Sequence, residues 1–237
     1  MDRKERERLL EAIRTRHSVR RYKEQPLEED ILTLLRQKIN ELNEKGSLNM
    51  QLVTDEPKGF SGLLAYGTFS GVRNYIVVAG RKGETFDERV GYYGEQLVLY
   101  AQTLGLNTCW AGLSYKKVPG TYKLNDGEKI SCYISIGYGE TQGTGHKIKT
   151  PEQVSNIGAD TPEWFKRGVE ASLLAPTAVN QQKFYFRYIS PNKPEEKAMV
   201  RAERGYSLVG YTKIDLGIAK YHFEIGAGPE NFKWAKD

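Results

Sequence analysis

The chain has 237 residues, a formal net charge of +5, 39% hydrophobic residues and 27% charged residues. This composition is typical of an ordinary soluble protein that can form a real core, in one large domain or two small ones. No run of about 18 apolar residues is present, and the charged N-terminus lacks the apolar core of an export signal. We therefore expect a cytoplasmic protein without a membrane partner.

The two cysteines predict neither a disulfide nor a metal site. Cys109 and Cys132 both lie in apolar segments without a CxxC pattern or neighbouring histidines. A buried, reduced thiol fits each of them better than a cross-link or a zinc ligand.

The positive charge is concentrated near the start of the chain, between Arg3 and Lys23, but acidic residues are interleaved with it. No DNA- or RNA-binding motif accompanies these charges, so we expect no nucleic-acid partner. Binding of a phosphate on a small molecule is the simpler explanation of this positive charge. One alternative is that the chain is a basic domain that binds nucleic acid or protein, which predicts salt-sensitive binding to polyanions.

The first predicted helix, Glu5 to Arg16, leads into a basic extended segment. Residues 14–22 read RTRHSVRRY, which places four arginines around His17 and Ser18. Guanidinium groups donate charge-assisted bonds in pairs, so with a hydroxyl they suit a phosphate. The alternative is a solvated helix end stabilised by the helix dipole, and the residues alone leave both interpretations open.

Periodicity predicts the core elements of the next hundred residues. Helices are expected at Pro26–Asn43 and at Tyr92–Leu106, where Gly105 caps the second helix, and strands at Asn74–Ala79 and Ser131–Gly139. Lys45–Gly71 is expected to be a long loop or a pair of irregular strands.

Two connecting segments have compositions that suit a ligand. Asn107–Leu113 is predicted to turn at Gly112, where small residues let a ligand approach backbone N–H groups. The later basic loop HKIKTPEQV carries Lys147 and Lys149, which either contact a phosphate or are simply exposed.

The most distinctive stretch is Ala175–Phe186, APTAVNQQKFYF. An amphipathic helix that begins at Pro162 must end at Pro176, and the chain leaves as an alternating aromatic strand through Phe184 and Tyr188. The short side chains of Thr177 and Asn180 bond either their own backbone or a ligand. This elbow suits a planar, hydrogen-bonding ligand, although an ordinary helix-to-strand connection has a similar composition.

The remainder is predicted as a charged linker, Asn192–Glu203, and a last helix, Asp215–Gly228. The interval from Gly94 to Gly105 equals that from Gly217 to Gly228. Because helix, elbow, strand and buried helix occur in the same order in both halves, we interpret the chain as a weak internal duplication.

Four of these segments resemble motifs of the FMN-dependent nitroreductases. RHSVRRY is similar to the family's Arg-x-Ser-x-Arg-x-aromatic motif, and APTAVNQQKFYF to its Ala-Pro-Ser-x-x-Asn-x-Gln segment. QLVLYAQTLGLNTCWAGL resembles its buried helix with a Gly-Leu-Gly-Thr-Cys-Trp ending. ISIGYGETQGTGHKIKTPEQV resembles its Gly-Tyr-Pro exit and basic phosphate loop, with Gly139 in place of the usual proline.

The position of the elbow departs from the usual pattern. Ordinary members carry it early in the chain and share it across a dimer, whereas here Phe60–Gly71 has lost it and the match lies in the second half. The chain therefore resembles a branch with two fused halves that mimic the dimer. This implies an α+β, nitroreductase-like single domain, residues 1–237. Its central, mostly antiparallel sheet would be flanked by helices, with pseudo-repeat halves at about 1–150 and 151–237.

The resemblance also implies the cofactor contacts. Arg16, His17 and Ser18 would bind the phosphate and ribityl end of FMN, joined by Lys147 and Lys149, of which the sequence does not select one. Arg20 would lie near the pyrimidine edge of the ring, and Gly112 and Leu113 would offer backbone N–H groups. The second half would contribute Pro176, Thr177 and Asn180, while Gln182 is expected to brace the loop.

The implied function is an FMN-dependent oxidoreductase. NADH or NADPH would donate hydride, and a nitroaromatic, quinone or similar small acceptor would receive it by a ping-pong mechanism with no catalytic side chain. The alternative is a non-enzymatic flavin-binding or flavin-sensing protein. Fusion predicts one flavin per chain in a monomer, with a homodimer also open. Tyr66, Phe69 and Tyr115 are weaker candidates for the substrate side.

Overall fold

A computed structural model describes residues 1–61, 68–191, 193 and 196–235. Within them the chain forms two compact units. Residues 15–145 make up the first, which we call the sheet unit. Residues 1–14 and those described in 146–237 make up the second, which we call the elbow unit. The expected pseudo-repeat halves remain a prediction.

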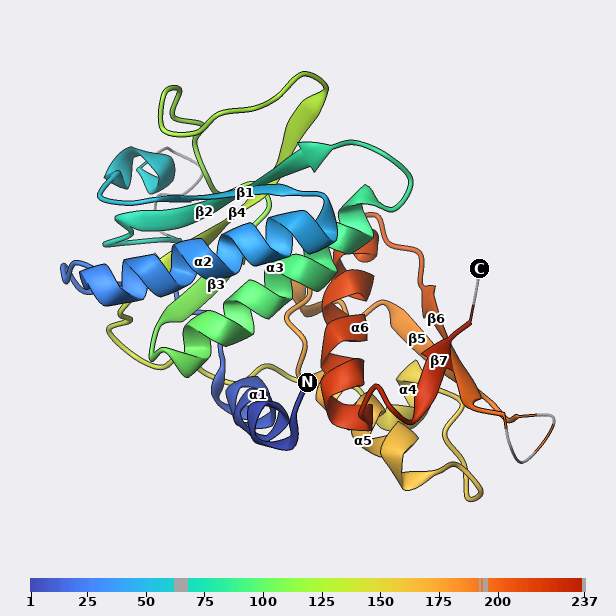
Figure 1. Ribbon diagram of the computed structural model, residues 1–237. Helices are drawn as coiled ribbons and strands as arrows, with labels where there is room; N and C mark the ends of the chain where they lie inside the picture. Colours follow the sequence, from blue (N-terminus) through green and yellow to red (C-terminus); the bar gives the residue numbers. More distant parts are fainter. Residues whose placement is uncertain (62–67, 192, 194–195, 236–237) are drawn as a thin grey trace. The chain divides into compact units, whose positions relative to one another are not determined.

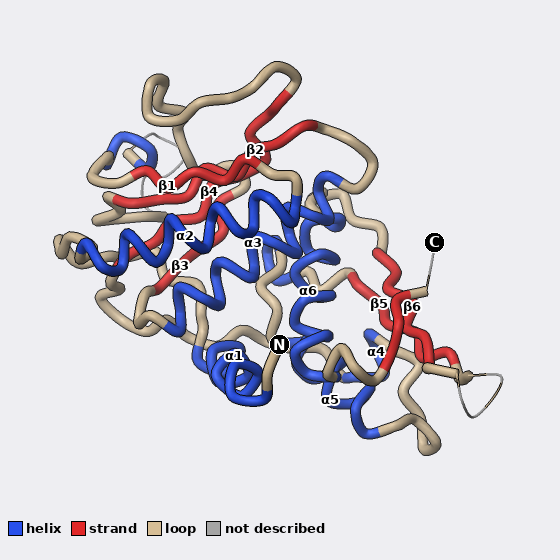
Figure 2. The backbone as a smooth tube through the Cα atoms, in the orientation of Figure 1, coloured by secondary structure: helices blue, strands red, loops and turns tan. Residues whose placement is uncertain are grey.

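The sheet unit is built on four antiparallel strands in the order β1-β2-β4-β3 (Figure 2). The strands span Asn49–Val53 (β1), Asn74–Arg81 (β2), Asn107–Ala111 (β3) and Glu128–Gly137 (β4). The first seven residues of β2 are buried, as expected of a strand paired on both sides. A short 3-10 turn, η1, covers Pro57–Phe60.

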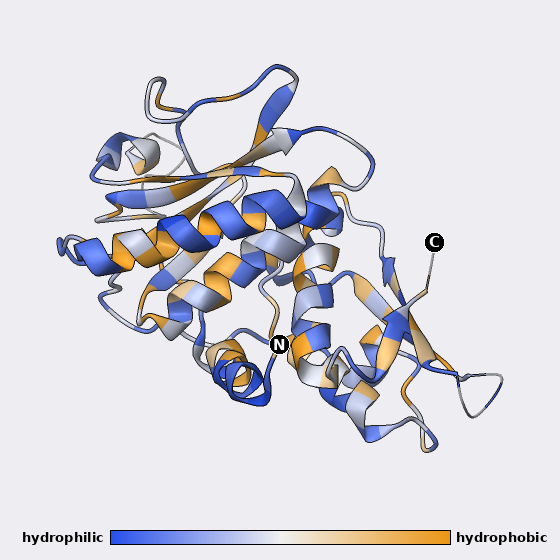
Figure 3. Ribbon diagram, in the orientation of Figure 1, coloured by the Kyte–Doolittle hydropathy of each residue, from blue (hydrophilic) through white to orange (hydrophobic). Residues whose placement is uncertain are grey.

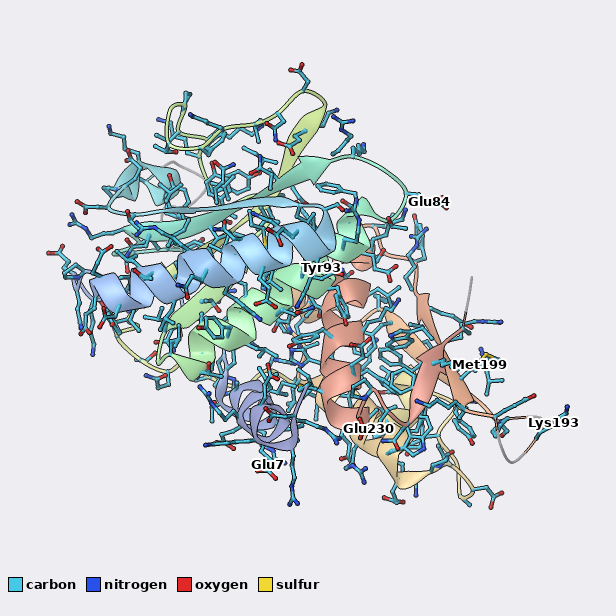
Figure 4. The ribbon with its side chains drawn as sticks, in the orientation of Figure 1. Glu7, Glu84, Tyr93, Lys193, Met199 and Glu230 are labelled. Atoms are coloured by element: carbon cyan, nitrogen blue, oxygen red, sulfur yellow. The ribbon has the colours of Figure 1, made fainter. Side chains whose placement is uncertain are left out.

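Two long helices, α2 (Glu29–Gly46) and α3 (Phe86–Thr103), lie side by side over this sheet (Figure 1). Leu35, Ile39 and Leu42 recur at helical spacing on the buried face of α2, and Figure 3 shows the alternation of apolar and polar residues along it. The helices meet closely where Gly46 faces Tyr93, labelled on α3 in Figure 4. A Cβ atom on Gly46 would lie only 2.7 Å from the tyrosine ring.

The elbow unit combines helices with a second, three-stranded sheet. Its helices are α1 (Arg3–Thr15), α4 (Pro151–Val154), α5 (Glu163–Leu173) and α6 (Thr212–Ala227). Its strands are β5 (Phe184–Ile189), β6 (Ala198–Arg204) and β7 (Phe232–Trp234). Strands β5 and β6 pair antiparallel, whereas β6 and β7 pair parallel.

Aromatic packing forms the core of the elbow unit. The Phe223 ring of α6 lies 4.7 Å from that of Phe186 on β5 and 5.4 Å from that of Phe165 on α5, and all three side chains are fully buried. Arg6 of α1 donates hydrogen bonds of 2.8 Å to the carbonyl oxygens of Ile225 and Gly226. A cation therefore satisfies the carbonyls at the C-terminal end of α6, where the helix dipole favours positive charge.

Most of the predicted elements are confirmed, but one prediction was wrong. The predicted turn at Gly112 is confirmed, whereas the residues before it, Asn107–Ala111, form strand β3, which was not predicted and which pairs with β4 along its whole length. Ala198–Arg204 is strand β6 rather than part of a linker, because it pairs with both β5 and β7 and buries Ala198 and Val200. Helix α4 and strand β7 were not predicted.

Burial explains the state of the cysteines. Cys109 and Cys132 are free, buried thiols, as predicted. Burial raises the pKa of the Cys132 thiol to about 12. Across the described residues, we find no helix that is both long and apolar enough to cross a membrane.

Candidate functional site

The basic segment after α1 runs beside β3 in the sheet unit. Ser18 forms a parallel bridge with Thr108, and the Val19 N–H donates to the Thr108 carbonyl oxygen at 3.1 Å. Further on, the Lys23 N–H donates to the carbonyl oxygen of Tyr138, just beyond β4. The predicted change from helix to extended segment is confirmed, and backbone pairing fixes it.

Arg16 is held beneath this segment by a buried carboxylate. Its side chain is almost completely buried, and its Nε atom lies 3.9 Å from Oε1 of Glu95 on α3. The second Glu95 oxygen, Oε2, accepts a 2.9 Å hydrogen bond from the indole N–H of Trp110. Burial lowers the pKa of Arg16, and the Glu95 charge acts in the opposite direction. The Arg16 Nε atom is buried without a hydrogen-bond partner, which is uncommon for a guanidinium group.

His17 and Ser18 pack against the glycine-rich chain that follows β4. A Cβ atom on Gly143 would lie 2.8 Å from the His17 Cβ atom and 3.1 Å from the Ser18 carbonyl oxygen, and the φ of Gly143 is +75°. Glycine is therefore required there both by space and by backbone conformation. Arg20, in contrast, is exposed. Thus the sheet unit brings together the four predicted residues Arg16, His17, Ser18 and Arg20.

Gly112 and Leu113 follow directly after β3. Gly112 lies in a bend and is half-buried, whereas the Leu113 side chain is 70% exposed. Nearby in sequence, Tyr115 stacks on Tyr133 with ring centroids 4.0 Å apart, and Phe69 packs against the same aromatic cluster. The third weak candidate, Tyr66, lies outside the described residues.

The elbow of the second unit, residues 176–182, is a tight loop with unusual backbone conformations. Val179, Asn180 and Gln182 all have positive φ, at 45°, 55° and 45°. Such values are uncommon for residues with a Cβ atom and rare for a β-branched one such as Val179. The turn η2 (Ala178–Asn180) is closed by a 2.9 Å hydrogen bond from the Asn180 N–H to the Thr177 carbonyl oxygen.

Gln182 braces the elbow, as predicted. Its buried side chain donates from Nε2 to the Lys147 carbonyl oxygen at 2.9 Å and accepts the Lys149 N–H on Oε1 at 3.0 Å. Asn180 Nδ2 also donates to the Lys147 carbonyl oxygen, at 2.7 Å. The elbow and the basic loop 146–149 are therefore joined inside the elbow unit.

The two candidate lysines differ in environment. The Lys149 ammonium donates to the Gln182 carbonyl oxygen at 2.7 Å, and burial lowers the pKa of Lys149, with a smaller contribution from the charge of Lys183. Lys147 is exposed, and its main chain, through its carbonyl oxygen, receives the bonds from the elbow. Lys149 is thus fixed to the loop by its side chain, whereas Lys147 is fixed only by its backbone.

Asp215 is a buried residue at the elbow that the sequence analysis missed. It lies in the first turn of α6 and is only 2% exposed. Oδ1 accepts the Ala178 N–H at 2.9 Å, and Oδ2 accepts from Gln181 Nε2 at 2.6 Å. Burial raises the pKa of Asp215 to about 6, although both hydrogen bonds act to lower it. In the sequence it is the first residue of the predicted helix Asp215–Gly228, where an acidic side chain is ordinary, so no local signal indicated its burial.

Each unit therefore assembles its own part of the predicted set. The sheet unit holds the basic segment with Gly112 and Leu113. The elbow unit holds the two lysines with Pro176, Thr177 and Asn180. Within the described residues, no group of three or more histidine, cysteine, aspartate or glutamate side chains is arranged to hold a metal ion.

The family model described as "Putative TM nitroreductase" matches residues 8–227. The chain belongs to this nitroreductase family. A crystal structure described as that of a "putative nitroreductase" from Thermotoga maritima matches 94% of this chain and 84% of its own, with 22% identity and a TM-score of 0.63. No curated protein sequence matches the chain.

A second solved structure, described as a "putative nitroreductase in complex with FMN" from Desulfovibrio desulfuricans, matches 65% of this chain and 98% of its own. It has 17% identity and a TM-score of 0.50. Together with the family match, these structures confirm the predicted α+β nitroreductase fold with its antiparallel sheet. The predicted origin from two fused halves remains a prediction for this nitroreductase-family chain.

Proposed function

We propose that this protein is an FMN-dependent oxidoreductase that passes hydride from NADH or NADPH to a small acceptor. The acceptor class would be a nitroaromatic, a quinone or a similar compound, used in a ping-pong mechanism. The observation that carries the proposal is the family match over residues 8–227, which includes all eleven predicted cofactor contacts. The FMN named for the Desulfovibrio protein supports the same cofactor.

The donors of the sheet unit fit a phosphorylated cofactor. An arginine whose buried Nε atom has no hydrogen-bond partner, an exposed arginine and a half-buried serine lie within five residues. Such a set suits a phosphate with nearly two negative charges, because charge-assisted bonds from guanidinium groups are strong. We assign Arg16, His17 and Ser18 to the phosphate and ribityl end, and His17 and Ser18 pack closely against Gly143, where a side chain would not fit.

The elbow unit would supply the remaining contacts. We propose that Lys147 rather than Lys149 contacts the phosphate, because the Lys149 ammonium already donates a hydrogen bond to the Gln182 carbonyl oxygen. Pro176, Thr177 and Asn180 would contact the ring and ribityl chain from this unit. If the halves are fused as proposed, one chain binds one FMN and functions as a monomer.

When bound, FMN supplies the redox chemistry, because its ring system can take up hydride from NADH or NADPH and release it to an acceptor. The protein would orient the reactants and stabilise charge. The Arg20 guanidinium would stabilise negative charge at the pyrimidine edge of the ring, and the backbone N–H groups of Gly112 and Leu113 would donate hydrogen bonds to its polar edge.

Steady-state kinetics of the FMN-loaded protein test this function. We expect oxidation of NADH or NADPH in the presence of a nitroaromatic or a quinone, with parallel double-reciprocal plots when both substrates are varied. Protein without FMN serves as the control and should be inactive. A protein that binds FMN but oxidises neither nucleotide with either acceptor would contradict enzymatic turnover and support a flavin-binding or flavin-sensing role.

A further inference from the structure

The elbow is connected to α6 by one buried carboxylate. Asp215 accepts the Ala178 N–H on Oδ1 and Gln181 Nε2 on Oδ2, so each of its oxygens holds a different part of the loop. Gln181 Nε2 also donates to the Gly210 carbonyl oxygen at 3.0 Å. The elbow, the start of α6 and the chain just before α6 are therefore joined through two side chains.

These bonds hold a loop that its own backbone does not favour. Val179, Asn180 and Gln182 have positive φ, and conformations of this kind persist only where the surrounding structure enforces them. Val179 is 77% exposed, so packing of its side chain does not hold it in place. Two sets of side-chain bonds hold the loop instead: Asp215 of α6 bonds Ala178 and Gln181, and the side chain of Gln182 bonds the Lys147 carbonyl oxygen of the basic loop.

An ionised carboxylate at this position is expensive for the fold. Burial disfavours its charge, and one buried polar atom beside it, Gln181 Oε1, has no hydrogen-bond partner. A neutral side chain would be the better choice if stability alone were selected. A strained loop held by an unfavourable buried charge is typical of a functional site, where stability is given up for geometry.

We propose that Asp215 is a positioning residue that holds elbow residues 176–182 in the conformation that receives the cofactor. This inference rests on the proposed function, because the elbow is assigned to FMN there. Asp215 itself does not contact the ligand in this account. It acts through the Ala178 N–H and through Gln181.

Three variants test the proposal: Asp215→Asn, Asp215→Ala and Gln181→Ala. Asparagine keeps an acceptor for the Ala178 N–H but turns an amide N–H₂ group toward Gln181, so one of the two bonds is lost. If the competent population of the loop falls to about a tenth in Asp215→Ala, the apparent FMN dissociation constant rises about tenfold. We expect a smaller rise, about threefold, in Asp215→Asn and in Gln181→Ala.

Two readouts separate positioning from general destabilisation. Hydrogen exchange of the Ala178 amide, measured in the protein without FMN, should accelerate in Asp215→Ala and less in Asp215→Asn. The urea midpoint of Asp215→Asn should equal or exceed that of the unsubstituted protein, while its FMN affinity falls. Asp160→Asn, an exposed substitution in the same unit, is the matched control and should change neither readout.

FMN affinity unchanged in Asp215→Ala, or a loss of affinity that simply follows the urea midpoint with Ala178 exchange unaltered, would overturn the positioning role. If the unsubstituted protein binds no FMN, the proposed function fails. The exchange of Ala178 then still decides whether Asp215 holds the elbow.

Discussion

Arg16 and Glu95 form a buried ion pair whose two partners depend on each other. Replacing Glu95 with Gln leaves the Arg16 charge buried without compensation, because Arg16 Nε has no hydrogen-bond partner of its own. We expect Glu95→Gln to lower the free energy of unfolding by about 3 kcal/mol in urea titration. Glu7→Gln is the control: its exposed pair with Arg3 should be worth less than about 1 kcal/mol. Equal effects in the two variants would contradict a buried pair.

The two lysines of the basic loop should give opposite phenotypes. Lys149→Ala removes a charge-assisted bond to the Gln182 carbonyl oxygen and should lower the free energy of unfolding by about 1–2 kcal/mol. Lys147→Ala removes an exposed ammonium and should leave stability unchanged, while FMN binding weakens about tenfold through the lost phosphate contact. Thermal unfolding and fluorescence titration with FMN measure both. Weaker FMN binding in Lys149→Ala alone would reverse the assignment.

Individual side chains were predictable from the sequence only in part. The bracing role of Gln182 was expected from the family resemblance, although its partners Lys147 and Lys149 lie 35 and 33 residues earlier in the chain. The burial of Arg16 was not, because its partner Glu95 is distant in sequence and is brought close by the packing of α3. Asp215 was missed for a related reason: its importance depends on Ala178 and Gln181, which only the tertiary structure places against α6.

The close contact between α5 and α6 depends on glycine. A Cβ atom on Gly226 would collide with the Arg167 carbonyl oxygen and lie 2.6 Å from the Ala171 Cβ atom. We expect Gly226→Ala to destabilise the protein by about 1–3 kcal/mol, because a backbone atom cannot move aside as a flexible side chain can. Gly83→Ala, where no atom lies within 4 Å of the added Cβ, should change stability by less than about 0.5 kcal/mol. A tolerated Gly226→Ala would contradict this packing.

The connection between the elbow and α6 should make stability depend on pH. The ordinary pKa of Asp215 is 3.8, and burial raises its pKa to about 6 in the folded chain. The folded state therefore holds this proton more tightly than the unfolded state, and the resulting stabilisation is present at low pH and lost as the pH rises through about 6. Between about pH 5 and about pH 7.5, the loss should amount to about 1.4 kcal/mol.

Urea titrations of the unsubstituted protein and of Asp215→Asn at both pH values isolate this contribution. As the pH rises, the free energy of unfolding of the variant should increase relative to that of the unsubstituted protein. The reason is that Asp215 loses its stabilising proton, whereas asparagine does not titrate. A difference independent of pH would show that Asp215 is ionised to the same extent in both states.

At the scale of elements, long periodic segments were predictable and short paired ones were not. Helix α2 was recognised because its apolar residues repeat over 18 residues. Strand β3 has only five residues, and its register with β4 comes from backbone pairing that leaves little pattern in sequence. Strand β6 was hidden because its inward residues include the small Ala198 and because the exposed Met199 interrupts the alternation of apolar and polar residues.

At the scale of the whole molecule, the resemblance gave the family and the fold, and both are confirmed. The motifs could be recognised because glycine, proline and arginine positions reflect local backbone and charge requirements. The contribution of each half to one cofactor stays a prediction. It depends on contacts between segments from different parts of the chain, which the local sequence patterns do not encode.

The most direct test of the account is the visible absorption spectrum of the purified protein, with released flavin quantified per chain and the mass in solution determined by light scattering. We predict a flavin spectrum, about one FMN per chain and a mass near the 26.9 kDa of a single chain. A colourless protein that also fails to take up added FMN would contradict the central claim.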